Sequence, residues 1–203
     1  MPLVDLGLPS RTLWCKYNLG VDPNKLNTAE DWYGGYYAWG EIKTKEYYNW
    51  DTYKFSSFTD GFSMIKYPLE IPRRSENLDN LYKLLLEDDA AYIVSNGLYK
   101  MPTIFQLKEL RDNTEHKWVE NYESIKGLNG LIFYKDEKEV FFPAAGYYWD
   151  GGLYKLSQCN IWSSSLDYNK DLYGKCLIIS KNDCVADEYD RAMGFNIRPV
   201  LNR

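Results

Sequence analysis

The sequence predicts an α+β fold, with two or three helices beside small antiparallel sheets in a single domain over residues 1–203. Helix-start signals stand in the middle of the chain, and short apolar runs separated by polar turns fill its C-terminal half. No linker rich in Ser, Gly or Pro and no repeat of roughly 20 to 50 residues divides the chain. A length of 203 residues fits one large domain.

The first third of the chain is expected to be extended and irregular. Residues 1–20 form an extended segment punctuated by Pro9 and Gly20. Residues 31–53 hold nine Tyr and Trp residues interrupted by glycines, a pattern that favours short strands and turns over a helix. Residues 54–74 show little periodicity, so a long loop is predicted there.

Helical signals follow in three segments. Apolar residues repeat at helical spacing over 78–85, after Ser75. A second helix can open at the Asp pair 88–89 and stop at Asn-Gly 96–97. In the third segment a Thr-x-x-Gln capping box at 103–106 predicts a helix from about residue 104 to 112–113.

The C-terminal half has the pattern of β-hairpins. Apolar runs at 128–133 and 140–142 flank the polar turn 135–138, and residues 147–149 run into the turn Asp-Gly-Gly at 150–152. Further strands are predicted at 160–163, 175–179, 184–186 and 195–200, with a loop at 180–183.

Charge and composition exclude several classes of function. The net charge is −5, whereas a protein that grips nucleic-acid phosphates needs a basic face, so no nucleic-acid partner is predicted. No run approaches the roughly 20 apolar residues that span a bilayer, so no membrane insertion is expected. The single histidine, His116, rules out multi-His zinc sites and is expected on the surface. We predict no metal and no cofactor.

The cysteines and one acidic loop leave alternatives open. Four cysteines allow three disulfide pairings, and buried thiols in a reducing compartment are the favoured interpretation. An EF-hand-like run, Asp167-x-Asn169-x-Asp171, lacks the later Gly and Glu of a calcium loop, so turn chemistry is the expected role. The four cysteines are Cys15, Cys159, Cys176 and Cys184.

Eight short motifs stand in a fixed order along the chain. They lie at 4–10 (VDLGLPS), at Trp14 with Asn18 and Gly20, at 35–41 (GYYAWGE), 88–91 (DDAA), 101–103 (MPT), 142–146 (FPAAG), 162–164 (WSS), and at Gly194 with 198–200 (RPV). In this order they resemble the Fibrobacter succinogenes major paralogous domain over nearly the whole chain. Arg11 and the pair Tyr99 and Lys100 depart from that family's pattern, as packing substitutions.

The resemblance implies a C-type-lectin-like fold whose N- and C-terminal strands are adjacent. It makes Trp14, Trp39 and Trp162 expected core anchors, and Arg198 the expected partner of a carboxylate or of backbone carbonyls. The calcium-binding tripeptides of sugar-binding C-type lectins are absent from the sequence. Formylglycine-generating enzymes share the broader fold and use cysteines. Cys176 and Cys184 could face each other across one hairpin, but no enzyme activity is predicted.

The aromatic content predicts a recognition surface. Nineteen Tyr, seven Trp and eight Phe make up 17% of the chain, and such rings supply large, stiff contact area. Loops of the C-terminal half carry the ligand in lectin-like folds, so those rings are the candidates; the alternative is that they fill the core. The predicted ligand-binding residues are Tyr148, Trp149, Asp150, Tyr154, Tyr168 and Tyr173.

These observations predict a non-enzymatic module on a phage particle, as a head-fibre, decoration or tail-associated protein. Its expected partners are other virion proteins and a host glycan or protein, and homo-oligomerisation is left open. Residues 1–6 lack the features of a signal peptide, so we expect assembly in the host cytoplasm; an extracellular or cell-surface location is the alternative. The alternative functions are a structural virion assembly or capsid-stabilising protein, an exported bacterial surface protein, and an enzyme of the formylglycine-generating branch.

Overall fold

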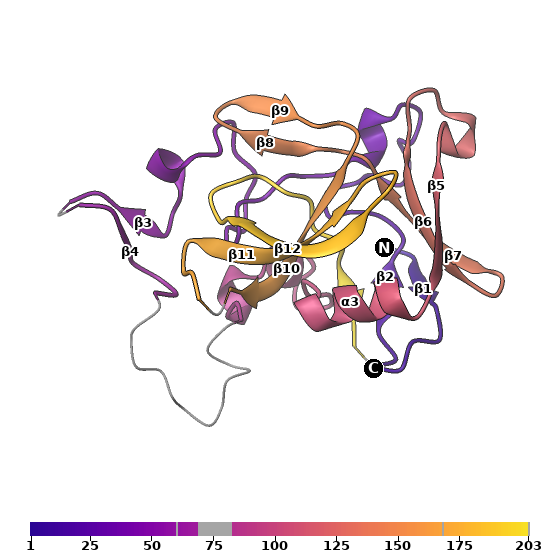
Figure 1. The fold of residues 1–203 in the computed structure, drawn as a ribbon, viewed down its shortest axis with the longest axis horizontal. Coiled ribbons are helices and arrows are strands. Elements are labelled where there is room, and N and C mark those ends of the chain that lie inside the picture. The colour runs from indigo at the N-terminus through magenta and orange to yellow at the C-terminus, as the bar shows by residue number, and fades with distance from the viewer. Residues whose placement is uncertain (60, 69–82, 168, 203) are drawn as a thin grey trace.

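The computed structural model describes residues 1–59, 61–68, 83–167 and 169–202 (Figure 1). Small antiparallel sheets with few helices make up this part of the chain, as the α+β prediction requires. No helix in the described ranges is both long and apolar enough to cross a bilayer.

A three-stranded sheet of β10 (Cys159–Leu166), β11 (Tyr173–Ile179) and β12 (Cys184–Asp190) lies at the centre. All eight residues of β10 are buried. Successive side chains of a strand point to opposite faces, so Ile161 packs in one apolar cluster and Trp162 in another. Helix α3 (Ile104–Asp112) covers the Ile161 face through Ile104, Leu107 and Leu110.

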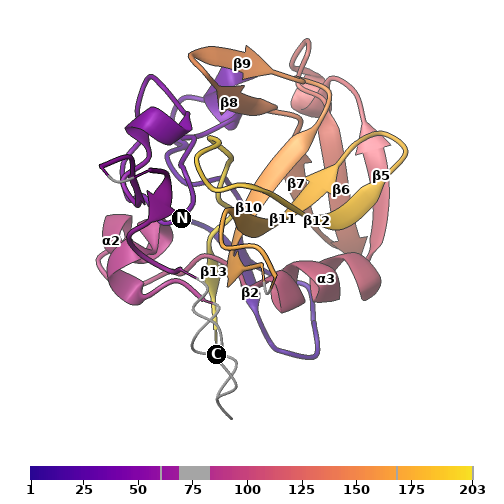
Figure 2. The same ribbon diagram turned by 60° about the vertical axis from the view of Figure 1, so that its left-hand side comes forward.

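A second sheet contains β5 (Glu115–Val119), β6 (Gly130–Lys135) and β7 (Lys138–Pro143) (Figure 2). The hairpin predicted from the apolar runs 128–133 and 140–142 is confirmed as β6 and β7. Its turn is shorter than the predicted 135–138, because Asp136 takes the left-handed φ of 55° that a two-residue turn needs. Strand β5 was not predicted. Its first three residues are charged or polar, and His116 among them is exposed as expected.

The N- and C-terminal strands lie in one sheet, in agreement with the adjacency that the resemblance implied. Strand β2 (Leu13–Cys15) lies between β1 (Leu3–Asp5) and β13 (Val200–Leu201), and Trp14 is opposite Val200. The predicted strand over 195–200 is wrong in extent. Phe195 makes an isolated bridge to Tyr37, and β13 begins only after Pro199, which has no N–H to donate.

Two of the three predicted helices form where the capping signals placed them. The Asp89 carboxylate accepts the Tyr92 N–H at the start of α2 (Ala90–Val94). Thr103 and Gln106 form the predicted capping box of α3. Most of the predicted helix over 78–85 lies outside the described residues, and positions 83–85 are not helical.

The aromatic first third differs from the prediction in detail. Residues 31–53 form turns and single-turn 3-10 helices, and two-residue strands appear inside the predicted loop 54–74. The 3-10 helices are η1 (Glu30–Trp32), η2 (Trp50–Thr52), η3 (Leu86–Asp88) and η4 (Tyr122–Ser124); the short strands are β3 (Ser56–Ser57) and β4 (Ser63–Met64).

The anticipated core anchors are buried. Trp14, Trp39 and Trp162 have no exposed surface. Arg198 is buried as well, and it donates hydrogen bonds to backbone carbonyls rather than pairing with a carboxylate.

Candidate functional site

The predicted aromatic hairpin exists as β8 (Tyr147–Trp149) and β9 (Gly152–Tyr154), at the top of Figure 1. Tyr147 is opposite Tyr154, and Trp149 is opposite Gly152. Asp150 and Gly151 form the two-residue turn, with φ values of 46° and 78°. Both values are left-handed, which is the geometry that an Asp-Gly turn supplies in a tight hairpin.

Backbone hydrogen bonds fix this hairpin to the body of the protein. Tyr148 and Gly194 exchange two N–H···O bonds of 2.9 Å, and the Asp150 N–H donates to the Tyr48 carbonyl at 2.9 Å. The Tyr148 ring lies against the rings of Tyr36 and Tyr48, with centroids 4.7 and 5.8 Å apart. The turn is therefore held in place before any ligand arrives.

The phenols beneath the hairpin are satisfied hydrogen-bond donors. The Tyr48 hydroxyl donates to the Tyr36 carbonyl, and the Tyr36 hydroxyl donates to the Ala145 carbonyl. Burial raises the pKa of Tyr48 to about 12 and that of Tyr36 further. Both hydroxyls are hydrogen-bonded to backbone carbonyls of neighbouring segments, so this layer supports the hairpin.

The predicted site residues divide into supporting and exposed positions. Tyr148 and Trp149 are half-buried and pack on the core, whereas Asp150 is exposed and Tyr154 is 47% exposed. Tyr173 is half-buried at the start of β11, in a different sheet, with the Lys170 ammonium 5.1 Å from its ring centroid. The predicted Tyr168 lies outside the described residues. The structure thus brings four of the six residues together in one hairpin.

Sequence analysis did not identify the loop with Tyr47 and Asn49, which lies beside the β8–β9 hairpin. Asn49 Nδ2 donates to Asp150 Oδ1 at 3.1 Å. Tyr47 is 57% exposed, and its ring packs so closely on Gly151 that an added Cβ would lie 2.9 Å from the Tyr47 Cε1 atom. We call Tyr47, Asn49, Asp150, Gly151 and Tyr154 the hairpin surface.

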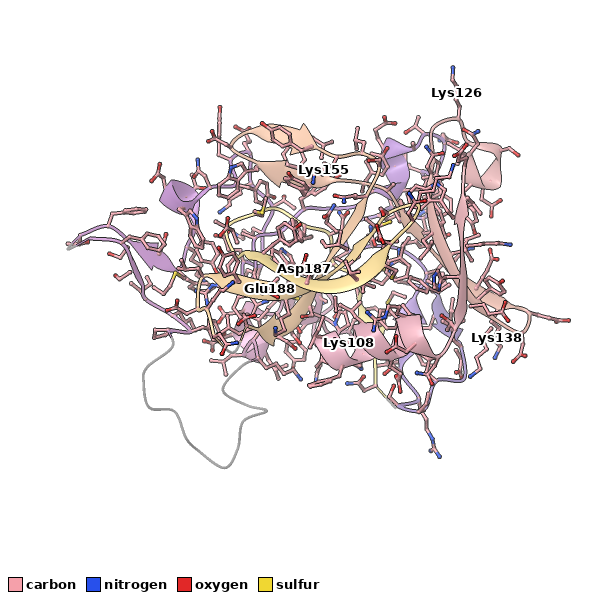
Figure 3. The ribbon with its side chains drawn as sticks, viewed as in Figure 1. Lys108, Lys126, Lys138, Lys155, Asp187 and Glu188 are labelled. Atoms are coloured by element: carbon pink, nitrogen blue, oxygen red, sulfur yellow. The ribbon has the colours of Figure 1, made fainter. Side chains whose placement is uncertain are left out.

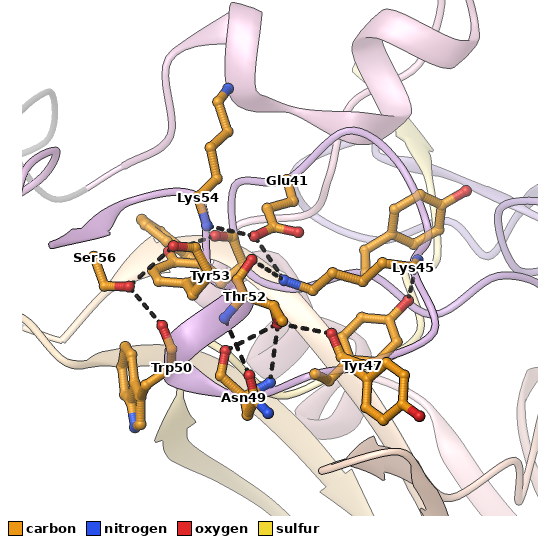
Figure 4. A network of polar contacts seen from close by, with 12 residues as sticks. Glu41, Lys45, Tyr47, Asn49, Trp50, Thr52, Tyr53, Lys54 and Ser56 are labelled. Carbon is orange, nitrogen blue, oxygen red and sulfur yellow. Dashed lines mark hydrogen bonds and ion pairs between the residues drawn. The ribbon is translucent and has the colours of Figure 1, made fainter. Parts of the chain in front are cut away.

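A polar network holds the loop that carries Tyr47 and Asn49 (Figure 4). The Glu41 carboxylate accepts the Lys45 ammonium at 2.9 Å and the Lys54 N–H at 2.8 Å. Asn49 and Thr52 form a capping box on η2, in which the Asn49 side chain accepts the Thr52 N–H at 3.1 Å. These bonds close the loop on itself and fix where Tyr47 stands.

Exposed apolar side chains continue beyond η2. Phe58 and Phe62 lie 5.2 Å apart, and Phe62 meets Trp50 edge-to-face at 5.2 Å. Phe58, Phe62 and Ile65 are all exposed around the β3–β4 strands, which project from the body in Figure 1. Exposed apolar groups that lie together are typical of contact surfaces.

The four cysteines are free thiols with raised pKa values. None is in a disulfide, and the predicted arrangement of Cys176 opposite Cys184 is wrong: Cys176 lies opposite Asp187, because the β11–β12 turn pairs Cys184 with Ile179. Burial raises the pKa of Cys15 and Cys184 to about 11 and that of Cys159 and Cys176 further. A thiol with a raised pKa is mostly protonated and weakly nucleophilic at neutral pH.

The acidic loop after β10 forms a turn. Asp167 accepts the Asn169 N–H at 2.7 Å and the Lys175 ammonium at 2.9 Å. Burial acts to raise the pKa of Asp167, but these hydrogen bonds outweigh it and the net pKa is lowered. Within the described ranges, no group of three or more His, Cys, Asp or Glu side chains is arranged to hold a metal ion.

Comparison of the chain with protein-family models, with curated proteins and with solved structures gave no match.

Proposed function

We propose that this protein is a non-enzymatic recognition module that binds a glycan or a protein through the hairpin surface. This proposal rests on two exposed phenol rings: Tyr47 packs against Gly151 of the fixed turn and Tyr154 against the adjacent Gly152. Between these segments the Asp150 carboxylate accepts the Asn49 amide. Flat rings can stack on sugar rings or anchor a partner chain, and Asp and Asn oxygens accept hydroxyl donors. A rigid surface of this kind loses little conformational entropy on binding.

We further propose a C-type-lectin-like fold and a place on a phage particle. The pairing of the terminal strands β2 and β13 and the modest helix content support the fold. The family resemblance supports the place on the particle, as head fibre, decoration or tail-associated component. A cell-surface location is the alternative.

A glycan array combined with whole-cell binding tests the recognition role. The double variant Tyr47→Ala with Tyr154→Ala should lose binding by about thirtyfold or more, because a ring at an interface centre contributes about 2 kcal/mol or more. Phe105→Ala is the matched control, since Phe105 is 62% exposed but lies on α3. The proposal is rejected if the folded protein shows no binding in either assay, or if the double variant binds as tightly as the wild type.

A specific observation also favours a second function, a purely structural role in virion assembly. Phe58, Phe62 and Ile65 form an exposed apolar group that a neighbouring subunit could bury. Size-exclusion chromatography with light scattering tests self-assembly. A strict monomer whose binding in the array depends on Tyr47 and Tyr154 favours recognition over assembly.

A further inference from the structure

A groove on another part of the protein has the composition of a small-molecule site. It is formed by two adjoining cavities of about 520 and 440 Å³, lined by parts of β1, β7, η1 and η4. The cavities share the lining residues Lys16, Trp32 and Glu123, so they lie side by side. Each volume falls in the roughly 300–1,000 Å³ range of ligand pockets. We call this feature the β1–β7 groove; it shares no lining residue with the hairpin surface.

The wall of the groove is aromatic. Tyr122 stacks on Phe141 with ring centroids 4.0 Å apart, and Trp32 meets Tyr122 edge-to-face at 5.5 Å. Trp32 is 5% exposed, and its indole N–H has no hydrogen-bond partner among the residues the structure describes. Phe141 is buried and Tyr122 is half-buried, so Tyr122 is the ring of this cluster that a ligand can reach.

Charged groups of both signs surround these rings. Two lysines, Lys16 and Lys138, line the groove together with three carboxylates, Asp5, Glu123 and Glu139. Glu139 accepts the Tyr122 hydroxyl at 3.2 Å, and burial, followed by the Glu139 and Glu123 carboxylates, raises the pKa of that phenol. In the described part of the chain no ion pair joins Lys16, Lys138 or Glu123 to another residue, so their hydrogen-bonding capacity is open to a ligand.

The backbone beside the groove is strained and well fixed. Asn121, Glu123 and Ser124 have φ values of 53°, 53° and 62°, which are uncommon for residues other than glycine. The Asn121 carboxamide oxygen accepts the Gly127 N–H at 2.8 Å, and the Tyr122 N–H donates to the Leu128 carbonyl at 2.8 Å. Strain that is held in this way is often found at ligand sites.

We propose that the β1–β7 groove binds a neutral saccharide. One sugar ring lies against Tyr122, Lys16 donates a hydrogen bond to a hydroxyl, and Glu123 accepts one. Mixed charges favour a neutral ligand, because the fields of two lysines and three carboxylates partly cancel and leave only a small net charge to attract an ion. A hydroxyl both donates and accepts, so it can satisfy an ammonium and a carboxylate together.

The test uses the whole chain and three probes: the methyl glycosides of glucose, galactose and mannose. Binding is measured by saturation-transfer NMR and by calorimetry. We expect at least one glycoside to bind the wild type, and Lys16→Ala and Glu123→Gln each to weaken it roughly tenfold through loss of a charge-assisted hydrogen bond. Lys126→Ala is the control, because Lys126 is on the same loop but points away from the body in Figure 3.

Several results overturn the proposal. One is that no glycoside binds the folded wild type; another is that both groove variants bind as tightly as Lys126→Ala. Binding of acetate that Lys16→Ala abolishes, or of lysine methyl ester that Glu123→Gln abolishes, with no glycoside bound, makes the groove an ion site. Loss of glycoside binding in the Tyr47→Ala and Tyr154→Ala variant, with intact binding in the groove variants, assigns the sugar to the hairpin surface. That last result leaves the proposed function standing.

Discussion

Arg198 joins segments that are far apart in the sequence, and its replacement by methionine should strongly destabilise the fold. The buried guanidinium donates to the carbonyls of Lys16 and Phe141, at 3.1 and 2.8 Å, and to that of Cys15 at 3.3 Å. Its Nε–H donates to the Asn18 side chain at 3.0 Å. These contacts connect the end of β2 to β7.

The magnitude follows from what the substitution leaves behind. Methionine fills part of the space but donates nothing, so the three carbonyls and the Asn18 oxygen lose a donor. A buried acceptor without a partner costs about 1–3 kcal/mol. Burial disfavours the charged guanidinium and accordingly lowers the pKa of Arg198. A neutral side chain removes this desolvation penalty, which offsets part of the free energy lost at the unpaired acceptors. We expect a net loss of about 3–5 kcal/mol, a large share of the roughly 5–15 kcal/mol that stabilises a domain.

Denaturant unfolding followed by tryptophan fluorescence measures this change. Arg198→Lys should lose nearly as much, because one ammonium with three donors cannot reproduce the planar fork. Arg111→Met is the control: among the described residues, the Arg111 side chain forms an ion pair only with its neighbour Asp112, on a partly exposed helix end, so its loss should cost about 1 kcal/mol or less. If Arg198→Met lies within about 1 kcal/mol of the wild type, the account of the Arg198 hydrogen bonds is wrong.

Three further predictions concern the phenols, the helix cap and the thiols. Tyr48→Phe removes a phenol whose pKa burial raises to about 12. The folded state keeps that proton above pH 10 when the unfolded state loses it, so this stabilisation is complete below about pH 10 and declines toward pH 12. The variant should be about 1–3 kcal/mol less stable at pH 7 in urea melts. Its stability should also fall less steeply above pH 10, and parallel slopes would contradict this. Thr103→Ala removes the acceptor of the Gln106 N–H and should cost about 1 kcal/mol, whereas an unchanged urea midpoint would argue against the cap. Iodoacetamide at pH 8 should label the native thiols slowly, with the half-buried Cys184 first, and mass spectrometry should find all four labelled after denaturation; rapid labelling of one thiol would favour the cysteine-enzyme alternative.

The hairpin surface shows how far sequence reasoning reaches. The Asp-Gly turn and the strands beside it were predicted because a two-residue turn is fixed by its own φ preferences. Tyr47 and Asn49 were missed, although the aromatic segment that holds them was noted. Asn49 and Asp150 are 101 positions apart, and no local pattern encodes a hydrogen bond over that separation.

The same limit explains the errors elsewhere. Strand β5 begins with charged residues, so it lacks an apolar alternation, and it forms because β6 offers a partner. Cys176 and Cys184 could have faced each other on the sequence spacing alone, but register is set by the turn that pairs Cys184 with Ile179. The groove escaped prediction entirely, because its lining comes from four elements spread between β1 and β7.

The sequence by itself determined the α+β class, the two capped helices and the tight hairpins, since each depends on hydrogen bonds and backbone preferences within a few residues. It also determined that indoles at 14, 39 and 162 would anchor the core. Only the tertiary structure decided which aromatic rings are exposed and which groups surround them. Exposure is a property of what packs against a side chain, and those neighbours come from distant parts of the chain.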